Sequence, residues 1–283
     1  MDRLFVEQLT VLDFSYLHRQ RGLLGESWRV GVELVGLLDA QGMVLDFGIV
    51  KKRLKQLIDD YFDHRLLVPL GYRDLAIDDH ASQWRLRFTT EQGEIIEHDS
   101  PRQAVCGIEA AEITPEQVAQ AIAKRLRAEL PANIRSIHLH LEPEPIGGAC
   151  YQYSHGLKHH AGNCQRIAHG HRSALRILRN GQRAPDLEAN WARRWRDIYI
   201  GTREDLKSRE DAPCYRFAYR ASQGAFSLTL PASRCYLIDT ESTVENLARH
   251  IARQLHQADP DACFIVRAFE GIGKGAIAEA GPG

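Results

Sequence analysis

The sequence predicts an α+β protein built from two copies of one structural unit, the first over residues 1–146 and the second over residues 147–283. Three observations favour this organisation. Two helical segments match each other, each is followed by a similar strand, and each half begins with an aromatic strand that ends in histidine. Since the same elements recur in the same order, a duplication explains the chain better than one irregular domain.

The two matching helices cover Thr114–Leu126 and Thr243–Leu255. Each begins with threonine, and a glutamate follows two residues later, which is typical of a helix start. Apolar residues then recur at helical spacing, so one face of each helix is expected to be buried.

A strand is expected after each helix, over Ile137–Glu142 in the first half and Cys263–Glu270 in the second. The first segment alternates apolar and polar residues, as half-buried strands do, and the second is its counterpart. The interval from the helix-start glutamate to the strand-end glutamate is 26 residues in the first half and 25 in the second. This agreement is the main support for a repeat.

The beginning of each half also follows one pattern. Phe14–His18 and Tyr151–His155 are the aromatic strands, and Trp28–Gly36 is a second alternating strand in the first half. Asp46–Ile58 is predicted to be a helix capped by its aspartate. Each unit should therefore contain two strands, two helices and two more strands. The join at Glu144–Ala149 is too short for a flexible linker, so the units should pack side by side.

Composition excludes several classes of function. With 36 Lys and Arg against 37 Asp and Glu, the net charge of -1 offers no field for a nucleic-acid backbone. The apolar content of 44% is sufficient for packed cores. No apolar run reaches the roughly 20 residues of a membrane helix, and the beginning of the sequence lacks the apolar stretch of a signal peptide. The six scattered cysteines favour reduced thiols. We expect a cytoplasmic protein with neither nucleic acid nor membrane as partner.

Histidines near the start of the second half form the densest candidate site. His169 and His171 are two residues apart, so on a strand they project from one face. His155 on the neighbouring strand would supply a third nitrogen. Three protein ligands with one open position are typical of catalytic zinc sites. The alternative is a group of solvated loop histidines, and the adjacent His159 and His160 fit that interpretation better.

Two further positions could carry proton transfer. Asp63 and His64 are adjacent and could form an oriented acid–base pair, or could simply end a helix. Cys164 lies near the histidines, and a zinc ion with Arg166 or Lys158 nearby would favour its thiolate form. The alternative for Cys164 is a small side chain packed in a turn.

Glu270 ends a strand, where a carboxylate could accept two hydrogen bonds from an amino-pyrimidinone edge. An exposed glutamate at a strand end is the alternative. The loop that follows, Gly271–Gly275, resembles a phosphate-binding loop only loosely, because it lacks the Walker spacing and precedes no helix.

Together these motifs resemble the 6-pyruvoyltetrahydropterin synthase / 6-carboxytetrahydropterin synthase family, which has the tunnelling fold, in two tandem copies. The matching residues are Gly42–Phe47 and Asp63–Leu67 in the first half, and His155, Cys164, His169–His171, Thr243–Asn246 and Glu270 in the second. Their order and spacing, rather than any single motif, carry the resemblance.

The resemblance implies that each unit is a four-stranded antiparallel sheet with two helices on one face. It also implies a homo-oligomer, here a dimer or trimer of double units. By the same resemblance, three histidines bind Zn²⁺ and a cysteine thiolate acts with an Asp–His pair from an adjacent subunit. A glutamate anchors the pterin, and the usual substrate is 7,8-dihydroneopterin triphosphate.

Each half departs from the family pattern in a different place. The first half keeps Asp63–His64 but has Gly25–Arg29 in place of His-Gly-His, whereas the second keeps the histidines but has Arg203–Glu204 in place of Asp-His. This complementary loss predicts one composite site per pair of units. The gap from Cys164 to the next histidine is five residues, one longer than in the family. Glu142 also leaves room for a second, zinc-free pterin pocket in the first half.

The expected activity is that of a zinc-dependent lyase acting on 7,8-dihydroneopterin triphosphate. Its product would be 6-carboxytetrahydropterin, for queuosine and other 7-deazapurines, or 6-pyruvoyltetrahydropterin. The alternatives are a paralogue acting on another pterin in folate synthesis and a non-catalytic pterin- or metal-binding protein. The predicted site residues are His155, His169 and His171 for zinc, Cys164, Asp63 and His64 for proton transfer, and Glu270, Glu245, Thr243, Lys158 and Arg166 for substrate.

Overall fold

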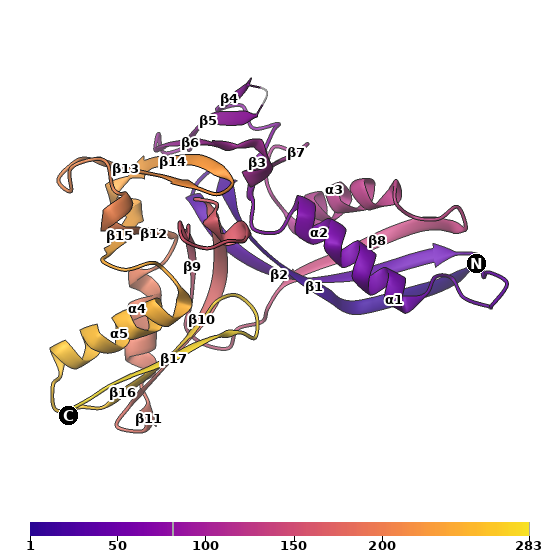
Figure 1. Ribbon diagram of the computed structural model, residues 1–283. Helices are drawn as coiled ribbons and strands as arrows, with labels where there is room; N and C mark the ends of the chain where they lie inside the picture. The colour runs from indigo at the N-terminus through magenta and orange to yellow at the C-terminus, as the bar shows by residue number, and fades with distance from the viewer. Residues whose placement is uncertain (81, 283) are drawn as a thin grey trace.

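The computed structural model describes residues 1–80 and 82–282, over which the chain forms an α+β fold with three sheets. Figure 1 shows two sets of helices on different sides of the molecule, with the N-terminus beside one set and the C-terminus beside the other. The predicted α+β class is confirmed. Among the described helices, none is both long enough and apolar enough to cross a membrane.

The first sheet belongs to the first half of the chain. Its strands, in spatial order, are β7 (Val105–Ile108), β3 (Leu66–Pro69), β1 (Asp2–His18), β2 (Gly22–Gly36) and β8 (Ile134–Pro143). The helical elements are α1 (Phe47–Ile49), the π-helical turn η1 (Val50–Leu54), α2 (Lys55–Tyr61) and α3 (Pro115–Arg127). Side chains from the sheet, such as Phe14, Val30 and Leu34, form one core with Val118 and Ile122 of α3.

The second sheet belongs to the second half. Its strands, in spatial order, are β15 (Cys235–Ile238), β12 (Ile198–Thr202), β9 (Cys150–His155), β10 (His169–Arg179), β16 (Phe264–Phe269) and β17 (Gly275–Ala280), with the short β11 (Gln182–Arg183) beside β10. Two helices, α4 (Pro185–Arg194) and α5 (Val244–Ala258), belong to this half. Ile177 and Val266 of the sheet share a core with Trp191 of α4 and Leu247 and Ile251 of α5.

The predicted helix starts are confirmed. The Asp46 carboxylate accepts hydrogen bonds from the backbone N–H groups of Gly48 (2.8 Å) and Ile49 (3.2 Å). The hydroxyl groups of Thr114 and Thr243 cap α3 and α5 by accepting from the N–H groups three residues later. These bonds satisfy backbone donors that would otherwise lack a partner in the first turn.

The two sheets share one strand order, with β7, β3, β1, β2 and β8 matched by β15, β12, β9, β10 and β16. This order is consistent with a duplication. The layout differs from the expected four antiparallel strands per unit, because the first described sheet has three antiparallel strands and the second has four besides the short β11. Each half also has two parallel strands, β3 and β7 beside β1 in the first half and β12 and β15 beside β9 in the second. In the first half, the helical segment after β2 returns the chain to the free edge of β1, where β3 pairs in parallel. In the second half, α4 returns the chain from β10 to the free edge of β9, where β12 pairs in parallel.

A third sheet, which the sequence did not predict, contains strands from both halves. Its order is β13 (Cys214–Ala221), β14 (Gly224–Pro231), β6 (Ile95–Pro101), β5 (Gln83–Thr89) and β4 (Leu75–His80). Leu228 of β14 lies opposite His98 of β6, so the backbone ladder itself connects the halves. Short 3-10 turns precede β7, β10, β13 and β15, namely η2 (Arg102–Ala104), η3 (Asn163–Gln165), η4 (Arg203–Asp205) and η5 (Ala232–Arg234).

The β1–β2 and β9–β10 hairpins cross in direct contact. A Cβ atom at Gly25 would lie 1.8 Å from the carbonyl oxygen of Tyr153, and one at Gly170 would lie 2.6 Å from Cα of Gly25. At the same crossing the hydroxyl oxygens of Ser15 and Ser154 are 2.7 Å apart. Larger side chains at the glycines would separate the hairpins, so these residues permit the close approach that brings the two halves together.

Candidate active site

Three buried histidines lie where β9 ends and β10 begins. His155 and His169 are directly opposite in the antiparallel register, and His171 follows on the same strand. Their side chains are almost fully excluded from solvent. The ring centroids of His155 and His169 are 4.3 Å apart, and that of His171 lies 5.3 and 5.7 Å from them. The sequence-based placement of the three imidazoles on neighbouring strands is therefore confirmed.

The hydrogen bonds of two of these rings leave a nitrogen directed to the cluster. Nδ1 of His155 lies 3.1 Å from the Ser242 carbonyl oxygen, and Nδ1 of His169 lies 2.9 Å from that of Arg166. Since Nδ1–H donates to each carbonyl, Nε2 carries the lone pair, and both Nε2 atoms are buried without a hydrogen-bond partner. Buried polar atoms of this kind are costly unless a ligand satisfies them.

A zinc ion fits this arrangement. One ring nitrogen from each of His155, His169 and His171 can be chosen such that all three lie within 4.8 Å of one another. Burial lowers the pKa values of His155 and His169 well below the usual value, and neighbouring histidines lower them further. The rings of His155 and His169 are therefore neutral near pH 7, which is the form that binds metals. Carbonyl partners on the outer nitrogens are also typical of zinc-binding histidines.

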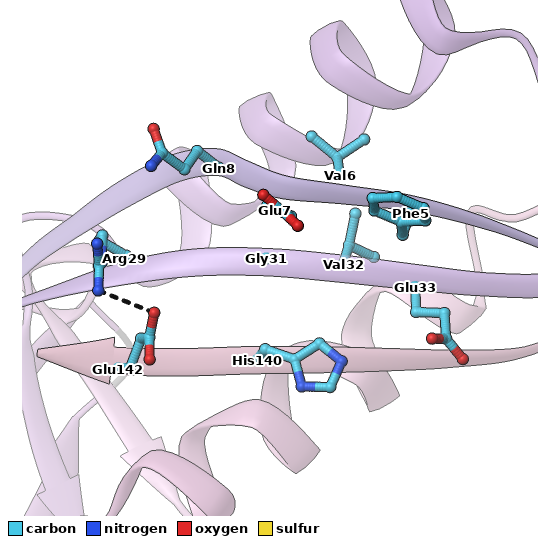
Figure 2. A pocket seen from close by; sticks show the side chains of 10 residues that line it. All are labelled: Phe5, Val6, Glu7, Gln8, Arg29, Gly31, Val32, Glu33, His140 and Glu142. Atoms are coloured by element: carbon cyan, nitrogen blue, oxygen red, sulfur yellow. Dashed lines mark ion pairs between the residues drawn. The ribbon is translucent and has the colours of Figure 1, made fainter.

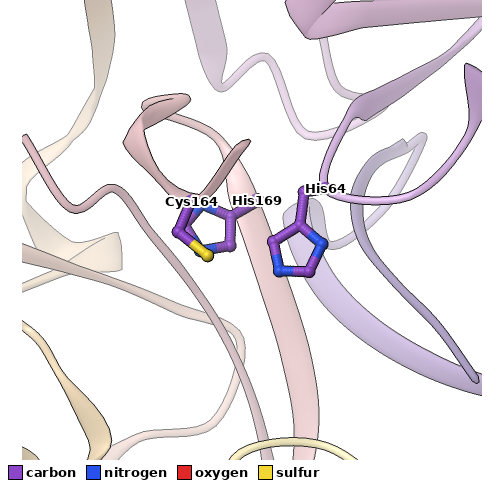
Figure 3. A group of neighbouring side chains, drawn as sticks. All are labelled: His64, Cys164 and His169. Carbon is purple, nitrogen blue, oxygen red and sulfur yellow. The ribbon is translucent and has the colours of Figure 1, made fainter. Parts of the chain in front are cut away.

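The predicted acid–base residues of the first half, Asp63 and His64, face this cluster. Figure 3 shows His64 opposite Cys164 and His169, and one ligand atom of each lies within 4.8 Å of the other two. Asp63 contacts Nδ1 of His64 at 2.5 Å. All these residues belong to one chain, so the structure brings the predicted composite cluster together without a second copy.

The turn after α2 fixes the orientation of His64. His64 has a positive φ of 53°, and its backbone N–H donates to the Asp13 carbonyl oxygen at 2.7 Å. Burial alone would lower the pKa of His64, but the Asp63 carboxylate and the Cys164 side chain outweigh burial and raise it to about 10. His64 is therefore expected to carry a proton that it can give to a neighbouring group.

Cys164 lies on η3, in the loop that connects β9 and β10. The buried Gln165 ties this loop to the β13–β14 hairpin, because its backbone oxygen accepts from the Tyr219 hydroxyl (2.8 Å) and its side-chain oxygen accepts from Gln223 N–H (2.7 Å). The 3-10 turn accommodates the spacing of five positions from Cys164 to His169. The longer gap therefore does not remove the thiol from the histidine cluster.

Glu270 lies at the edge of the cluster. Its Oε1 atom is 3.8 Å from Nε2 of His171, and a quarter of its side chain is exposed to solvent. A partly exposed carboxylate beside the proposed metal position can contact a bound ligand and the surrounding water together.

Other predicted substrate contacts already have partners within the protein. Lys158 forms ion pairs with Glu204 (2.6 Å) and Asp205 (3.0 Å). The buried Arg166 donates to Gln223 and to the carbonyl oxygens of Asp63 and His64, so it supports the turn that carries the acid–base pair. Burial lowers the pKa of Arg166 to about 10. Their roles toward substrate stay predictions.

Thr243 and Glu245 lie at the start of α5, beside the histidine cluster. Thr243 caps the helix, and Glu245 is exposed in the first turn. The preceding residue, Ser242, contacts His155 through both its carbonyl and its hydroxyl oxygen. The sequence analysis missed Ser242, although its position directly before a helix cap was a usable signal.

The strand registers sharpen the predicted equivalences between the halves. Ser15 pairs with Gly25 and Leu66, just as Ser154 pairs with Gly170 and Tyr199. The two serines also meet at the crossing of the hairpins. The segment that occupies the positions of His169, Gly170 and His171 is therefore Leu24–Glu26, which begins one residue before the predicted Gly25–Arg29.

The counterpart of Asp63–His64 also differs from the prediction. Both α2 and α4 end three residues before a non-glycine residue with positive φ, His64 at 53° and Asp197 at 56°. Arg196–Asp197 therefore occupy the equivalent position. Arg203–Glu204, which the sequence analysis chose, follow β12 rather than precede it.

Four polar residues fill this second position, and we call them the Arg21–Asp197 cluster: Arg21, Glu26, Gln152 and Asp197. Arg21 donates to both carboxylate oxygens of Asp197, with 2.9 Å to Oδ2, and to Gln152 Oε1 at 2.5 Å. Gln152 donates in turn to Glu26 Oε2 at 2.9 Å. The protein's own groups thus satisfy one another here.

Glu142 lies apart from both clusters. Figure 2 shows it at the edge of a groove across β1, β2 and β8, paired with Arg29 at 3.0 Å. The groove has a volume of about 530 Å³, and 65% of the Glu142 side chain is exposed. A pterin pocket at Glu142 would therefore be an open sheet surface rather than an enclosed site.

Comparisons with known proteins agree with the motifs. A family model described as 6-pyruvoyl tetrahydropterin synthase matches residues 10–152. A protein of Pyrococcus abyssi named "Putative 6-carboxy-5,6,7,8-tetrahydropterin synthase" is 26% identical over 140 residues, which is 47% of this chain and 76% of the relative. A protein of Pyrococcus horikoshii with the same name is 26% identical over 141 residues, again 47% and 76%.

Solved structures of two further relatives are also similar to this chain. The 6-pyruvoyl tetrahydropterin synthase of Plasmodium vivax is 20% identical, with a TM-score of 0.42 over 51% of this chain and 92% of that one. The Plasmodium falciparum protein of the same name is 19% identical, with a TM-score of 0.42 and the same coverage.

Proposed function

The chain belongs to the 6-pyruvoyl tetrahydropterin synthase family, and on this premise we propose that it is a zinc-dependent lyase of 7,8-dihydroneopterin triphosphate. We further propose that residues 1–146 and 147–283 are tandem copies of one unit that share a single active site. The observation that supports both proposals is the meeting of Asp63–His64 from one half with Cys164 and three histidines from the other.

The three buried histidines are the proposed zinc ligands. Two of them hold an unpartnered Nε2 toward the common centre, which is the observation that favours a metal at this position. Bound zinc would polarise the side-chain oxygens of the substrate and acidify the adjacent C–H bond. Burial of the three rings excludes water from that side of the site.

Cys164 and His64 are the proposed proton-transfer residues. As a thiolate, Cys164 can remove a proton from substrate carbon, and His64 lies beside it. His64 can then give its proton to a substrate oxygen, since Asp63 stabilises the ring orientation. The pair thus supplies a base and an acid on two different residues.

Glu270 is the proposed anchor of the pterin ring. Its carboxylate can accept two hydrogen bonds from the amino-pyrimidinone edge, and it lies beside His171, so the ring would be held next to the metal. Thr243 and Glu245, at the start of α5, are proposed to contact the same ring. Lys158 and Arg166 would bind the triphosphate only by giving up contacts that they make within the protein.

We favour 6-carboxytetrahydropterin, a precursor of queuosine and other 7-deazapurines, as the product, and the names of the curated relatives support this choice over 6-pyruvoyltetrahydropterin. A paralogue that acts on another pterin and a non-catalytic pterin- or metal-binding protein are the alternatives. We also propose a cytoplasmic homo-oligomer, a dimer or trimer of double units.

Product analysis tests the proposal. Zinc-loaded protein is incubated with 7,8-dihydroneopterin triphosphate, and the products are identified by mass spectrometry and by an assay for acetaldehyde. We expect 6-carboxytetrahydropterin, acetaldehyde and triphosphate. Zinc bound at unit stoichiometry without turnover of this or any related pterin would instead identify a binding protein, and turnover of a different pterin would identify a paralogue.

A further inference from the structure

Asp13, on β1 of the first half, reaches across the molecule to the histidine cluster of the second half. Its Oδ1 atom lies 3.3 Å from Nδ1 of His171. Asp13 is buried, with 4% of its side chain exposed, and its other oxygen contacts Lys274 Nζ at 3.1 Å. The Ser27 hydroxyl donates to Oδ1 at 2.5 Å. A carboxylate buried this deeply is stable only beside such donors and positive charge.

The three histidines differ in what holds their outer nitrogen. His155 and His169 donate to backbone carbonyls of their own half, at Ser242 and Arg166. His171 makes no well-aligned hydrogen bond within the described residues, and the carboxylates within 4 Å of its ring are those of Asp13 and Glu270. Glu270 lies on the Nε2 side, which leaves Asp13 as the group that faces Nδ1.

The backbone of Asp13 also holds the acid–base pair. Its N–H donates to Asp63 Oδ1 at 2.9 Å, and its carbonyl oxygen accepts from His64 N–H at 2.7 Å. One residue therefore contacts the proposed zinc ligand through its side chain and the proton-transfer pair through its main chain. This arrangement fixes the spacing between the two parts of the site.

We propose that Asp13 is the positioning residue of His171, so that the first half of the chain determines how tightly the second half binds zinc. A carboxylate at Nδ1 selects the tautomer that leaves Nε2 free, and it increases the donor strength of the ring toward a cation. This inference rests on the proposed zinc site and adds to it the dependence on the other half of the chain.

Zinc affinity of purified full-length variants tests this inference without an activity assay. The dissociation constant is measured by competition with a chromophoric chelator. Asp13→Ala is expected to weaken binding about 10- to 100-fold, as the loss of a carboxylate behind a ligating histidine typically does. Asp13→Asn should lie between this variant and the wild type, because its amide oxygen still accepts from Nδ1–H without the negative charge.

Cobalt substitution supplies a second measurement. The visible spectrum of the cobalt-loaded protein reports ligand geometry, and it should shift in Asp13→Ala. Glu26→Gln is the matched control, since Glu26 is also a buried carboxylate of the first half, and its oxygens instead accept from Gln152 and from Ser27 N–H. It should keep the zinc affinity and the cobalt spectrum of the wild type.

The outcomes separate this inference from the proposed function. Wild-type protein that binds no zinc would contradict the zinc-dependent activity itself. Wild-type protein that binds zinc, with both Asp13 variants within twofold of its affinity, would overturn the role of Asp13 alone. Circular dichroism checks that the variants are folded, and if Asp13→Ala does not fold, Asp13→Asn decides the result.

Discussion

The histidine cluster and the Arg21–Asp197 cluster occupy equivalent positions of the two halves, yet their polar groups are arranged in opposite ways. In the first, buried ring nitrogens point to a common centre and find no partner among the described residues. In the second, Arg21 bonds Asp197 and Gln152, and Gln152 bonds Glu26. One position has donor atoms available for a ligand, and the other has its polar groups paired.

This difference suggests what each position contributes. Buried nitrogens without partners destabilise a fold, so such an arrangement is expected where a ligand compensates. A buried ion pair instead resists separation, because removal of one partner leaves the other charge without compensation. We interpret the histidine cluster as the reaction site and the Arg21–Asp197 cluster as a contact that keeps the two halves in register for it.

The largest expected effect is a loss of enzymatic activity when residues beside the histidine cluster are changed. Cys164→Ala and His64→Ala are each expected to lower kcat by about 10²- to 10⁴-fold, the usual contribution of one acid or base. Zinc content should stay unchanged in both, as measured by elemental analysis. Because both residues belong to one chain's site, co-assembly of the two inactive variants should recover no activity. Recovery would place the site between chains, and His159→Ala serves as the neutral control.

The next largest difference between the two halves should appear in zinc affinity. His169→Ala removes one of the three proposed ligands, so zinc affinity should fall by more than the roughly 100-fold upper value for an indirect contact. His18, at the end of the aromatic strand of the first half, is the matched control. His18→Ala should keep the wild-type zinc stoichiometry. Equal losses in both variants would contradict the assignment of zinc to the second half.

The free energy of unfolding should respond most strongly to changes in the Arg21–Asp197 cluster. Arg21→Met leaves the buried Asp197 carboxylate with only the exposed Arg196, at 3.9 Å, and is expected to lower the free energy of unfolding by about 3 kcal/mol. This value is at the lower end for buried pairs, since about a third of the Arg21 side chain is exposed. Denaturant titration measures the change. The double variant Arg21→Met, Asp197→Leu should be more stable than the single one, and a result in the opposite order would argue against the ion pair.

The smallest expected effect is a pH dependence of stability at Glu26. Burial raises the pKa of this carboxyl to about 7, despite the opposing Ser27 N–H and nearby arginines. Since the folded-state pKa lies above the unfolded value, the folded protein binds more protons between about pH 4.5 and 7. The stabilisation is therefore present at acidic pH and is lost as the pH rises through 7.

Glu26→Gln should remove this dependence. The difference in unfolding free energy between wild type and variant is expected to change by about 2 kcal/mol between pH 5 and pH 8, with the wild type favoured at pH 5. Denaturant titrations at several pH values measure it. Glu97→Gln, on an exposed strand position, should show a flat difference. A flat difference for Glu26→Gln as well would mean that the carboxyl is ionised throughout this range.

The sequence by itself determined the repeated order of elements, the capped starts of three helices and the two neighbouring strands that carry the histidines. These features follow from local spacing. Periodicity identifies a helix face or a strand face, and the separation of His169 from His171 alone places both rings on one side. The pairing of Asp63 with its neighbour His64 was predictable for the same reason.

Tertiary structure alone decided which residues of the two halves meet. Asp13 lies beside His171, Arg21 beside Asp197 and His98 opposite Leu228, and each pair joins residues from opposite halves. No local pattern marks such contacts, because they depend on how the crossed hairpins and the shared third sheet orient the halves. The equivalence of Asp197 with His64 likewise became visible only from the backbone, since the helical segments that precede these positions differ in length.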